Sequence, residues 1–145
     1  RALLVPMRNM AQALHQQGRL ADAVGACRDA LSISRRVNGD TDLATMNLQG
    51  NLGYYLRLAG EALDAQQLLA EATRSFEAHF GLGHPLTLMP KLELALAHRD
   101  LGNFAEASIL LEALIATEPA SAEARALIEQ ARIEHEHLGE RPEHP

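Results

Sequence analysis

The chain has 145 residues, 47% of them hydrophobic and 3% aromatic, and a formal net charge of −6 at pH 7. An acidic chain without a basic stripe and interleaved aromatic residues argues against a nucleic-acid partner, and no apolar run of about eighteen residues predicts a membrane-spanning helix. The single cysteine, Cys27, excludes an internal disulfide and is predicted to be a small core residue in a reducing, cytoplasmic compartment.

Three glycines, Gly18, Gly60 and Gly102, recur at equal intervals along the chain, and each is followed five residues later by an alanine. We call the interval from one of these glycines to the next the period. A fixed period of about 40 residues is typical of stacked supersecondary units, none of which buries its apolar face alone. Apolar residues recur at helical spacing before and after each glycine, so each period is predicted to hold two helices. Glycine suits the turn between them because it tolerates positive φ. The sequence therefore predicts an all-α fold.

Taken in chain order, the helix pairs are expected at about residues 1–38, 43–80 and 85–118. Pro85 is expected at the start of a helix, where its missing N–H has no cost. The chain opens at Arg1 in mid-pattern, so we expect further repeats to precede it.

The third period carries the sequence Leu101-Gly102-Asn103-Phe104-Ala105-Glu106-Ala107, followed by Pro119. This segment resembles a tetratricopeptide repeat, and the joint at 81–88, G-x-G-H-P-x-T-L, is similar to the long variant of kinesin light chains and of many bacterial repeat arrays. The resemblance covers residues 1–119 and implies a right-handed α-solenoid of three helix-turn-helix units. The second period departs from the family pattern at Gly53 and Ala62, so looser packing is expected there.

A further helix is predicted at 120–139, where it would cap the array, followed by a disordered tail at 140–145. Ser121 is its expected N-cap. Its apolar side is predicted to consist of Leu127, Ile128, Ala131 and Ile133. A terminal repeat needs a helix with one polar face, which this segment supplies.

The resemblance also implies a function, because the first helices of such arrays line a concave groove that holds an extended peptide or a helix of a partner protein. Asparagines on these helices would pair with a peptide backbone, since an amide both donates and accepts hydrogen bonds. The expected groove residues are Arg8, Asn9, Gln12, His15, Asn47, Asn51, Tyr54, Met89, Glu93 and Leu96. For Asn9 and Asn51, a helix-helix hydrogen bond that stabilises the stack is the competing interpretation.

Some members of the family clamp a partner's C-terminal carboxylate with basic residues, but Met89 and Glu93 stand at those positions here. A partner's C-terminus is therefore disfavoured. Two alternatives to a peptide-binding adaptor stay open. One is a regulatory arm of a larger bacterial signalling or transcription-regulating protein, and the other is a homo-oligomer formed through exposed repeat ends. The arginine-rich first period could also meet an acidic partner.

Catalysis is not predicted. The sequence has no phosphate-binding loop, no H-E-x-x-H motif and no G-x-S-x-G elbow. The histidines near the C-terminus, His135, His137 and His144, have no second cluster that would complete a metal site. We therefore expect no enzymatic activity, no cofactor and no bound metal.

Overall fold

The computed structural model describes residues 11–140, which contain helices and connecting turns but no strand. Residues 11–16 are helical and precede the first glycine turn. The six helices that follow in chain order are α2 (Leu20–Asn38), α3 (Leu43–Leu58), α4 (Ala62–Phe80), α5 (Pro85–Asp100), α6 (Phe104–Ile115) and α7 (Ala122–Glu140).

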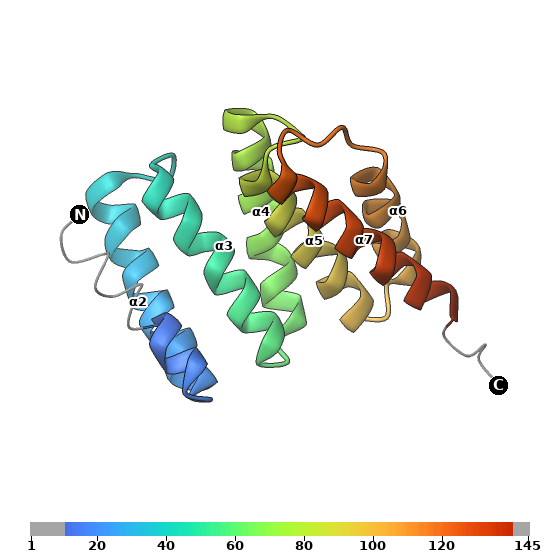
Figure 1. Cartoon of the computed structure of the whole chain (residues 1–145). Helices are drawn as coiled ribbons and strands as arrows, with labels where there is room; N and C mark the ends of the chain where they lie inside the picture. Colours follow the sequence, from blue (N-terminus) through green and yellow to red (C-terminus); the bar gives the residue numbers. More distant parts are fainter. Residues whose placement is uncertain (1–10, 141–145) are drawn as a thin grey trace.

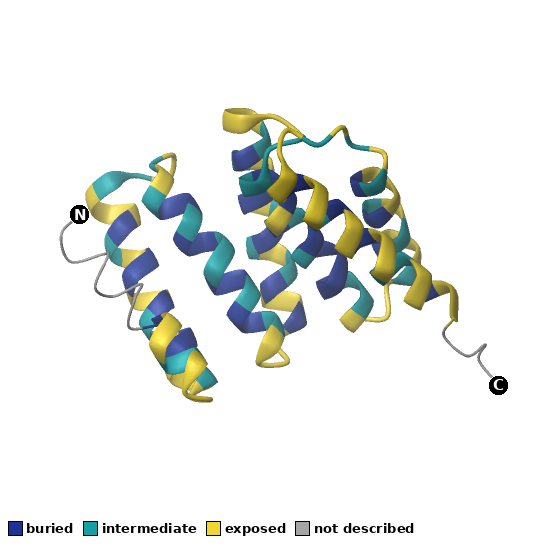
Figure 2. Cartoon of the chain, in the orientation of Figure 1, coloured by how far each residue is buried: buried dark blue, intermediate teal, exposed yellow. Residues whose placement is uncertain are grey.

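Each helix packs against the next one in the chain, so the helices form a stack rather than a bundle around one core (Figure 1). In addition, α5 contacts α3 on one side and α7 on the other. Buried residues face the neighbouring helices and exposed residues face outward (Figure 2). The all-α solenoid predicted from the sequence is confirmed. We call helix 11–16, α3 and α5 the first helices, and α2, α4 and α6 the second helices.

The turns explain the periodic glycines. Gly18, Gly60 and Gly102 have φ values of 77°, 86° and 81°, in the region that only glycine occupies at little cost. They lie directly after a first helix, as predicted. Gly39 and Gly81, which are also one period apart, have φ values of 85° and 80° and follow α2 and α4. Both kinds of joint therefore repeat with the same period.

Side chains cap the starts of three helices. Asp42 accepts a hydrogen bond from the backbone N–H of Ala44 at 3.0 Å, and His84, one period later, accepts one from Leu86 at 3.1 Å through Nδ1. Pro85 follows His84 at the first position of α5, as predicted. Ser121 accepts a hydrogen bond from Ala124 N–H at 3.1 Å, which confirms it as the cap of α7. These bonds satisfy backbone donors that the helix cannot pair itself.

The expectation of looser packing in the second period is wrong at Gly53. A Cβ atom built on this glycine would lie 2.6 Å from Cγ of Leu69 on α4, and Leu69 is fully buried. Gly53 therefore allows α3 and α4 to approach more closely than any side chain would permit. The departure from the family pattern reflects tight packing between the two helices.

The predicted apolar side of α7 needs one correction. Ile128 and Ala131 are buried and Leu127 is partly buried, but Ile133 is 38% exposed. Two residues turn the helix by about 200°, which places Ile133 on the opposite side from Ala131. Leu138, seven residues beyond Ala131, completes the buried side instead.

Candidate functional site

A hollow of about 810 Å³ crosses one face of the array and is lined by residues of helix 11–16, α3, α5 and α7, with contributions from α2 and α4. We call it the first-helix groove. The first helices line it because each period returns the same helical face to the same side of the stack. Successive periods therefore contribute successive segments of one continuous surface.

The structure brings seven of the residues expected from the sequence together in this groove. They are Gln12, His15, Asn47, Asn51, Tyr54, Met89 and Glu93. Leu96 does not line it: this side chain is only 7% exposed, and α5, which carries it, packs against α3 as well as α7. Arg8 and Asn9 lie outside the described residues.

The middle of the groove combines amides with an exposed thioether. Asn47 and Asn51 are one helical turn apart on α3, so their side chains lie on the same face. Within residues 11–140 no hydrogen bond engages either side-chain amide. Met89 on α5 is 50% exposed, so half of this apolar side chain is open to the groove. Both polar and apolar groups are thus available to a bound segment.

Aromatic rings form one wall of the groove. His15 lies against Tyr54 and Tyr55, with ring centroids 5.8 Å and 5.2 Å apart, and the two tyrosine rings are 5.5 Å apart. Tyr55 is 7% exposed, and burial raises the pKa of its phenol, with smaller contributions from Cys27 and Tyr54. Mutual packing restricts these rings before any partner arrives.

A second group of rings stands where α4 meets α5. The Phe80 ring lies 6.0 Å from Phe76 and 4.8 Å from His84, measured between centroids. Phe76 and His84 both line the groove, together with Pro90 inside α5. Proline has no N–H to donate to the carbonyl of Leu86, one turn earlier in the helix. The groove wall here is therefore mainly apolar and includes a backbone carbonyl, that of Leu86, which Pro90 cannot pair.

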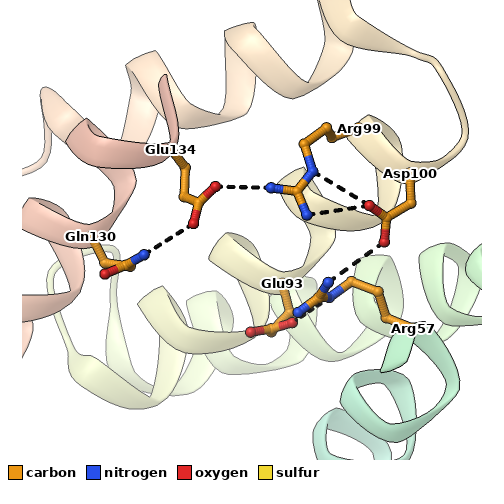
Figure 3. Close-up of polar contacts among 6 residues, drawn as sticks. All are labelled: Arg57, Glu93, Arg99, Asp100, Gln130 and Glu134. Atoms are coloured by element: carbon orange, nitrogen blue, oxygen red, sulfur yellow. Dashed lines mark hydrogen bonds and ion pairs between the residues drawn. The ribbon is translucent and has the colours of Figure 1, made fainter. Parts of the chain in front are cut away.

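Glu93 has a partner that the sequence analysis did not identify. Its carboxylate accepts a hydrogen bond from Arg57 Nε at 2.7 Å, and the two side chains are only 15% and 13% exposed (Figure 3). Burial raises the pKa of Glu93, and the opposing effect of Arg57 does not fully offset it. Burial would lower the pKa of Arg57, but the charges and hydrogen bonds of Glu93 and Asp100 together outweigh it, and the pKa is raised. The Glu93 carboxylate is thus already paired within the chain, through Arg57.

The ion pairs continue along the stack. Arg57 also lies 3.5 Å from Asp100, which lies 3.3 Å from Arg99, and Arg99 bonds Glu134 of α7 at 2.8 Å (Figure 3). The network joins α3, α5 and α7. A signal for it does exist in the sequence: Arg57 and Arg99 are one period apart, and each pairs with a glutamate that lies somewhat less than one period further on.

The period also explains why Asn51 differs from Glu93. The two residues are one period apart and occupy equivalent positions, and the residue equivalent to Arg57 in the preceding period is His15. Between the first and second periods, therefore, the imidazole of His15 and the amide of Asn51 stand where Arg57 and Glu93 form the ion pair between the second and third periods. Glu93 is occupied by Arg57, whereas the Asn51 amide makes no hydrogen bond with any described residue.

Neither a metal site nor a membrane span emerges from the described part of the chain. No group of three or more His, Cys, Asp or Glu side chains within it is placed to hold a metal ion. Between residues 11 and 140, no helix has the length and apolar character needed to cross a bilayer. Cys27 is buried, and burial raises the pKa of its thiol to about 12, which opposes its use as a nucleophile.

Known proteins share this architecture. A Podosopora anserina putative kinesin light chain with nearly identical TPR-like repeats superposes with a TM-score of 0.75 at 21% identity, covering 93% of this chain and 71% of its own. BtubC (BKLC) from P. vanneervenii gives a TM-score of 0.76 at 14% identity, covering 99% and 67%. Curated protein sequences give no match. The tetratricopeptide-repeat family matches residues 2–78, just over half of the 145 residues, and the chain therefore belongs to that family.

Proposed function

We propose that this chain is a protein-interaction module and that the first-helix groove binds an extended or helical segment of a partner protein. Tetratricopeptide repeats generally mediate contacts between proteins, and this array has a groove formed by its first helices. The observation that carries the proposal is the presence in that groove of amides without hydrogen-bond partners among the described residues, beside an exposed apolar side chain. The donors and acceptors of these amides are therefore available to hydrogen-bond a bound segment.

The amides supply recognition of a peptide backbone. Asn47 and Asn51 each offer one acceptor and two donors, which complement a backbone C=O and N–H whatever the partner's sequence. If Asn51 instead stabilised the stack, its amide would bond a neighbouring helix. No such bond exists among the described residues, which favours the role in binding.

Apolar side chains supply most of the affinity. Met89 is flexible and half-exposed, so it can adapt to the shape of an incoming side chain. Tyr54 and His15, in contrast, are held by ring contacts and present a wall with little entropy left to lose. An anchor residue of the partner would bury its apolar surface between Met89 and this wall.

The charged residues that line the first-helix groove indicate which kind of partner segment it would bind. The described lining of the groove includes the carboxylates of Glu93 and Glu123 but no Lys or Arg. A segment rich in Asp or Glu, or one that ends in a free carboxylate there, would be repelled by Glu123 and would find no Lys or Arg among the described lining residues, while Arg57 already pairs with Glu93. The favoured occupant is an uncharged or basic segment with apolar residues spaced for one face of a helix or strand.

A binding experiment with matched variants tests the proposal. The chain, an Asn51→Ala/Tyr54→Ala variant and an Asp64→Ala/Gln67→Ala control on the exposed side of α4 are immobilised and exposed to cell lysate. Proteins retained by the chain and the control, but not by the groove variant, are candidates. Peptides from each candidate are then titrated by calorimetry.

The single change Asn51→Ala should weaken peptide binding by about 1–3 kcal/mol, the cost of leaving a buried partner group without its hydrogen bond. Circular dichroism and the melting temperature should change little. If Asn51→Ala instead lowers the melting temperature and spares binding, Asn51 is a stacking residue and the proposal fails at this position. Equal binding by both double variants would exclude the groove altogether.

Three further expectations from the sequence stay predictions. These are a cytoplasmic location, a regulatory arm of a larger bacterial protein, and self-association through repeat ends. The pull-down bears on the last of these, because retained copies of the chain itself would indicate self-association.

A further inference from the structure

A second surface lies between two second helices, α2 and α4. Two hollows of about 620 and 500 Å³ adjoin there and share Arg35 and Asp40 in their linings. Leu52 of α3 contributes to the floor. We call this surface the arginine cleft, and none of its lining residues also lines the first-helix groove.

Four arginines surround the cleft: Arg28, Arg35 and Arg36 on α2, and Arg74 on α4. All four are exposed. Within residues 11–140, only Arg35 of these four makes ion pairs, at 3.5 Å to Asp40 and at 3.9 Å to Glu71. Pairs this long between exposed side chains contribute little and are easily displaced.

The repeat itself shows that the fold does not require these arginines. Moving one period along the chain leads to the equivalent positions, which lie on α4 and directly after α6. The residues at these positions are Ala70, Glu77, Ala78 and Ala116. None of these residues is basic, so the repeat fold does not need arginine at these positions. The arginine cluster is specific to the positions on α2 and α4. A chain with a net charge of −6 has concentrated positive charge at this place.

The floor of the larger hollow is apolar, whereas the smaller hollow is lined by Gln49, Glu71 and Ser75 beside its arginines. Leu31 and Leu52 are 3% exposed, and Leu68 of α4 is partly exposed beside them. Guanidinium groups around an apolar floor complement a segment that carries both carboxylates and apolar side chains. Arginine suits this task because its planar group can bond both oxygens of a carboxylate.

We propose that the arginine cleft docks a segment of a partner protein in which Asp or Glu alternates with apolar residues. The carboxylates would pair with Arg28, Arg36 and Arg74, and the apolar side chains would cover the leucine floor. The first-helix groove, with its two glutamates and no described Lys or Arg, disfavours the same segment. The two surfaces therefore select partner segments of opposite charge.

The test uses a fluorescein-labelled peptide of alternating glutamate pairs and leucines, and a second peptide with glutamine in place of every glutamate. Fluorescence anisotropy measures binding to the chain, to an Arg36→Glu/Arg74→Glu variant, and to an Arg125→Glu/Arg132→Glu control. The control changes the net charge equally but on α7, where both arginines are exposed. Circular dichroism verifies that each variant is folded.

The glutamate peptide should bind at least about tenfold more tightly than the glutamine peptide. The cleft variant should lose at least about tenfold in affinity, and the α7 control should stay within about twofold of the unmodified chain. Equal affinity of the two peptides would overturn the proposal, as would equal losses in both variants. Salt-sensitive self-association that disappears in the cleft variant would assign the surface to a second copy of the chain and also overturn it. The Asn51→Ala/Tyr54→Ala variant should bind the glutamate peptide normally, so failure here is distinguishable from failure of the groove proposal.

Discussion

The Arg57–Glu93 ion pair offers the most quantitative test of how the stack is held together. Replacing Arg57 with methionine keeps most of the apolar stem and removes the charge. Glu93, whose side chain is only 15% exposed, would then lose the 2.7 Å hydrogen bond and its counter-charge together. Breaking a buried pair from one side costs about 3–5 kcal/mol, because the remaining charge stays uncompensated.

The double variant Arg57→Met/Glu93→Gln isolates the cause. Removing both charges leaves no buried ion, so the double variant should recover to within about 1–2 kcal/mol of the unmodified chain. Asp100 loses Arg57 in both variants but keeps its ion pair with Arg99, which lies 3.3 Å away in the unmodified chain. The effect of Asp100 on stability should therefore be the same in the two variants. The assay is urea denaturation followed by circular dichroism. A single variant that costs less than about 1 kcal/mol, or a double variant no more stable than the single, would refute this reasoning.

The same variants make a prediction about pH. Burial already holds the folded-state pKa of Glu93 above the ordinary value, and removal of Arg57 should raise it further. A folded state with the higher pKa binds the proton more readily, so the stability of Arg57→Met should improve as pH falls through that pKa. The deficit relative to the double variant should be full above the folded-state pKa of Glu93 and shrink below it. A deficit independent of pH would show that Glu93 is not its source.

Three further predictions concern the core. The buried hydroxyl of Thr87 has no hydrogen-bond partner among the described residues, so Thr87→Val should be neutral or stabilising by about 1 kcal/mol. Thr45→Val should instead destabilise the fold by about 1–3 kcal/mol, because it breaks the 2.6 Å hydrogen bond between Thr45 and Ser34. Urea denaturation measures both variants, and equal effects would contradict this prediction. Gly53→Ala should cost about 1–3 kcal/mol through the clash with Leu69, although alanine ordinarily favours a helix, and a gain in melting temperature would contradict the packing described. Cys27, with a pKa of about 12, should react with Ellman's reagent at pH 8 about a thousandfold more slowly in the folded chain than in urea, and comparable rates would show the thiol to be accessible.

The periodic features were predictable because local chemistry dictates them. A positive φ at the end of a first helix nearly requires glycine, so Gly60 and Gly102 mark the turns in the sequence as clearly as in the structure. Helix caps are similarly local, and Ser121 was identified from its neighbours alone. Helical spacing also indicated which side chains of the first helices share a face, including Asn47 and Asn51.

Features that depend on the next helix were not predictable from one period. Leu96 has the spacing of a groove residue, but it is buried in the packing of α5 against its neighbouring helices. Gly53 predicts looser packing from the sequence pattern alone, because its role depends on the position of Leu69 on the next helix. The sequence pattern assigns no partner to Arg57, since Glu93 lies on a helix of the next period. In each case the deciding contact comes from a part of the chain that is distant in the sequence.

The most direct test of the proposed function is site-specific photo-crosslinking at two matched positions. Benzoylphenylalanine replaces Met89, which is 50% exposed in the first-helix groove, or Ile109, which is 59% exposed on α6 and outside it. Each protein is irradiated with a partner identified by pull-down. We predict a crosslink to the partner from position 89 and none from position 109. A crosslink from 109 alone would contradict the assignment of the groove as the binding surface.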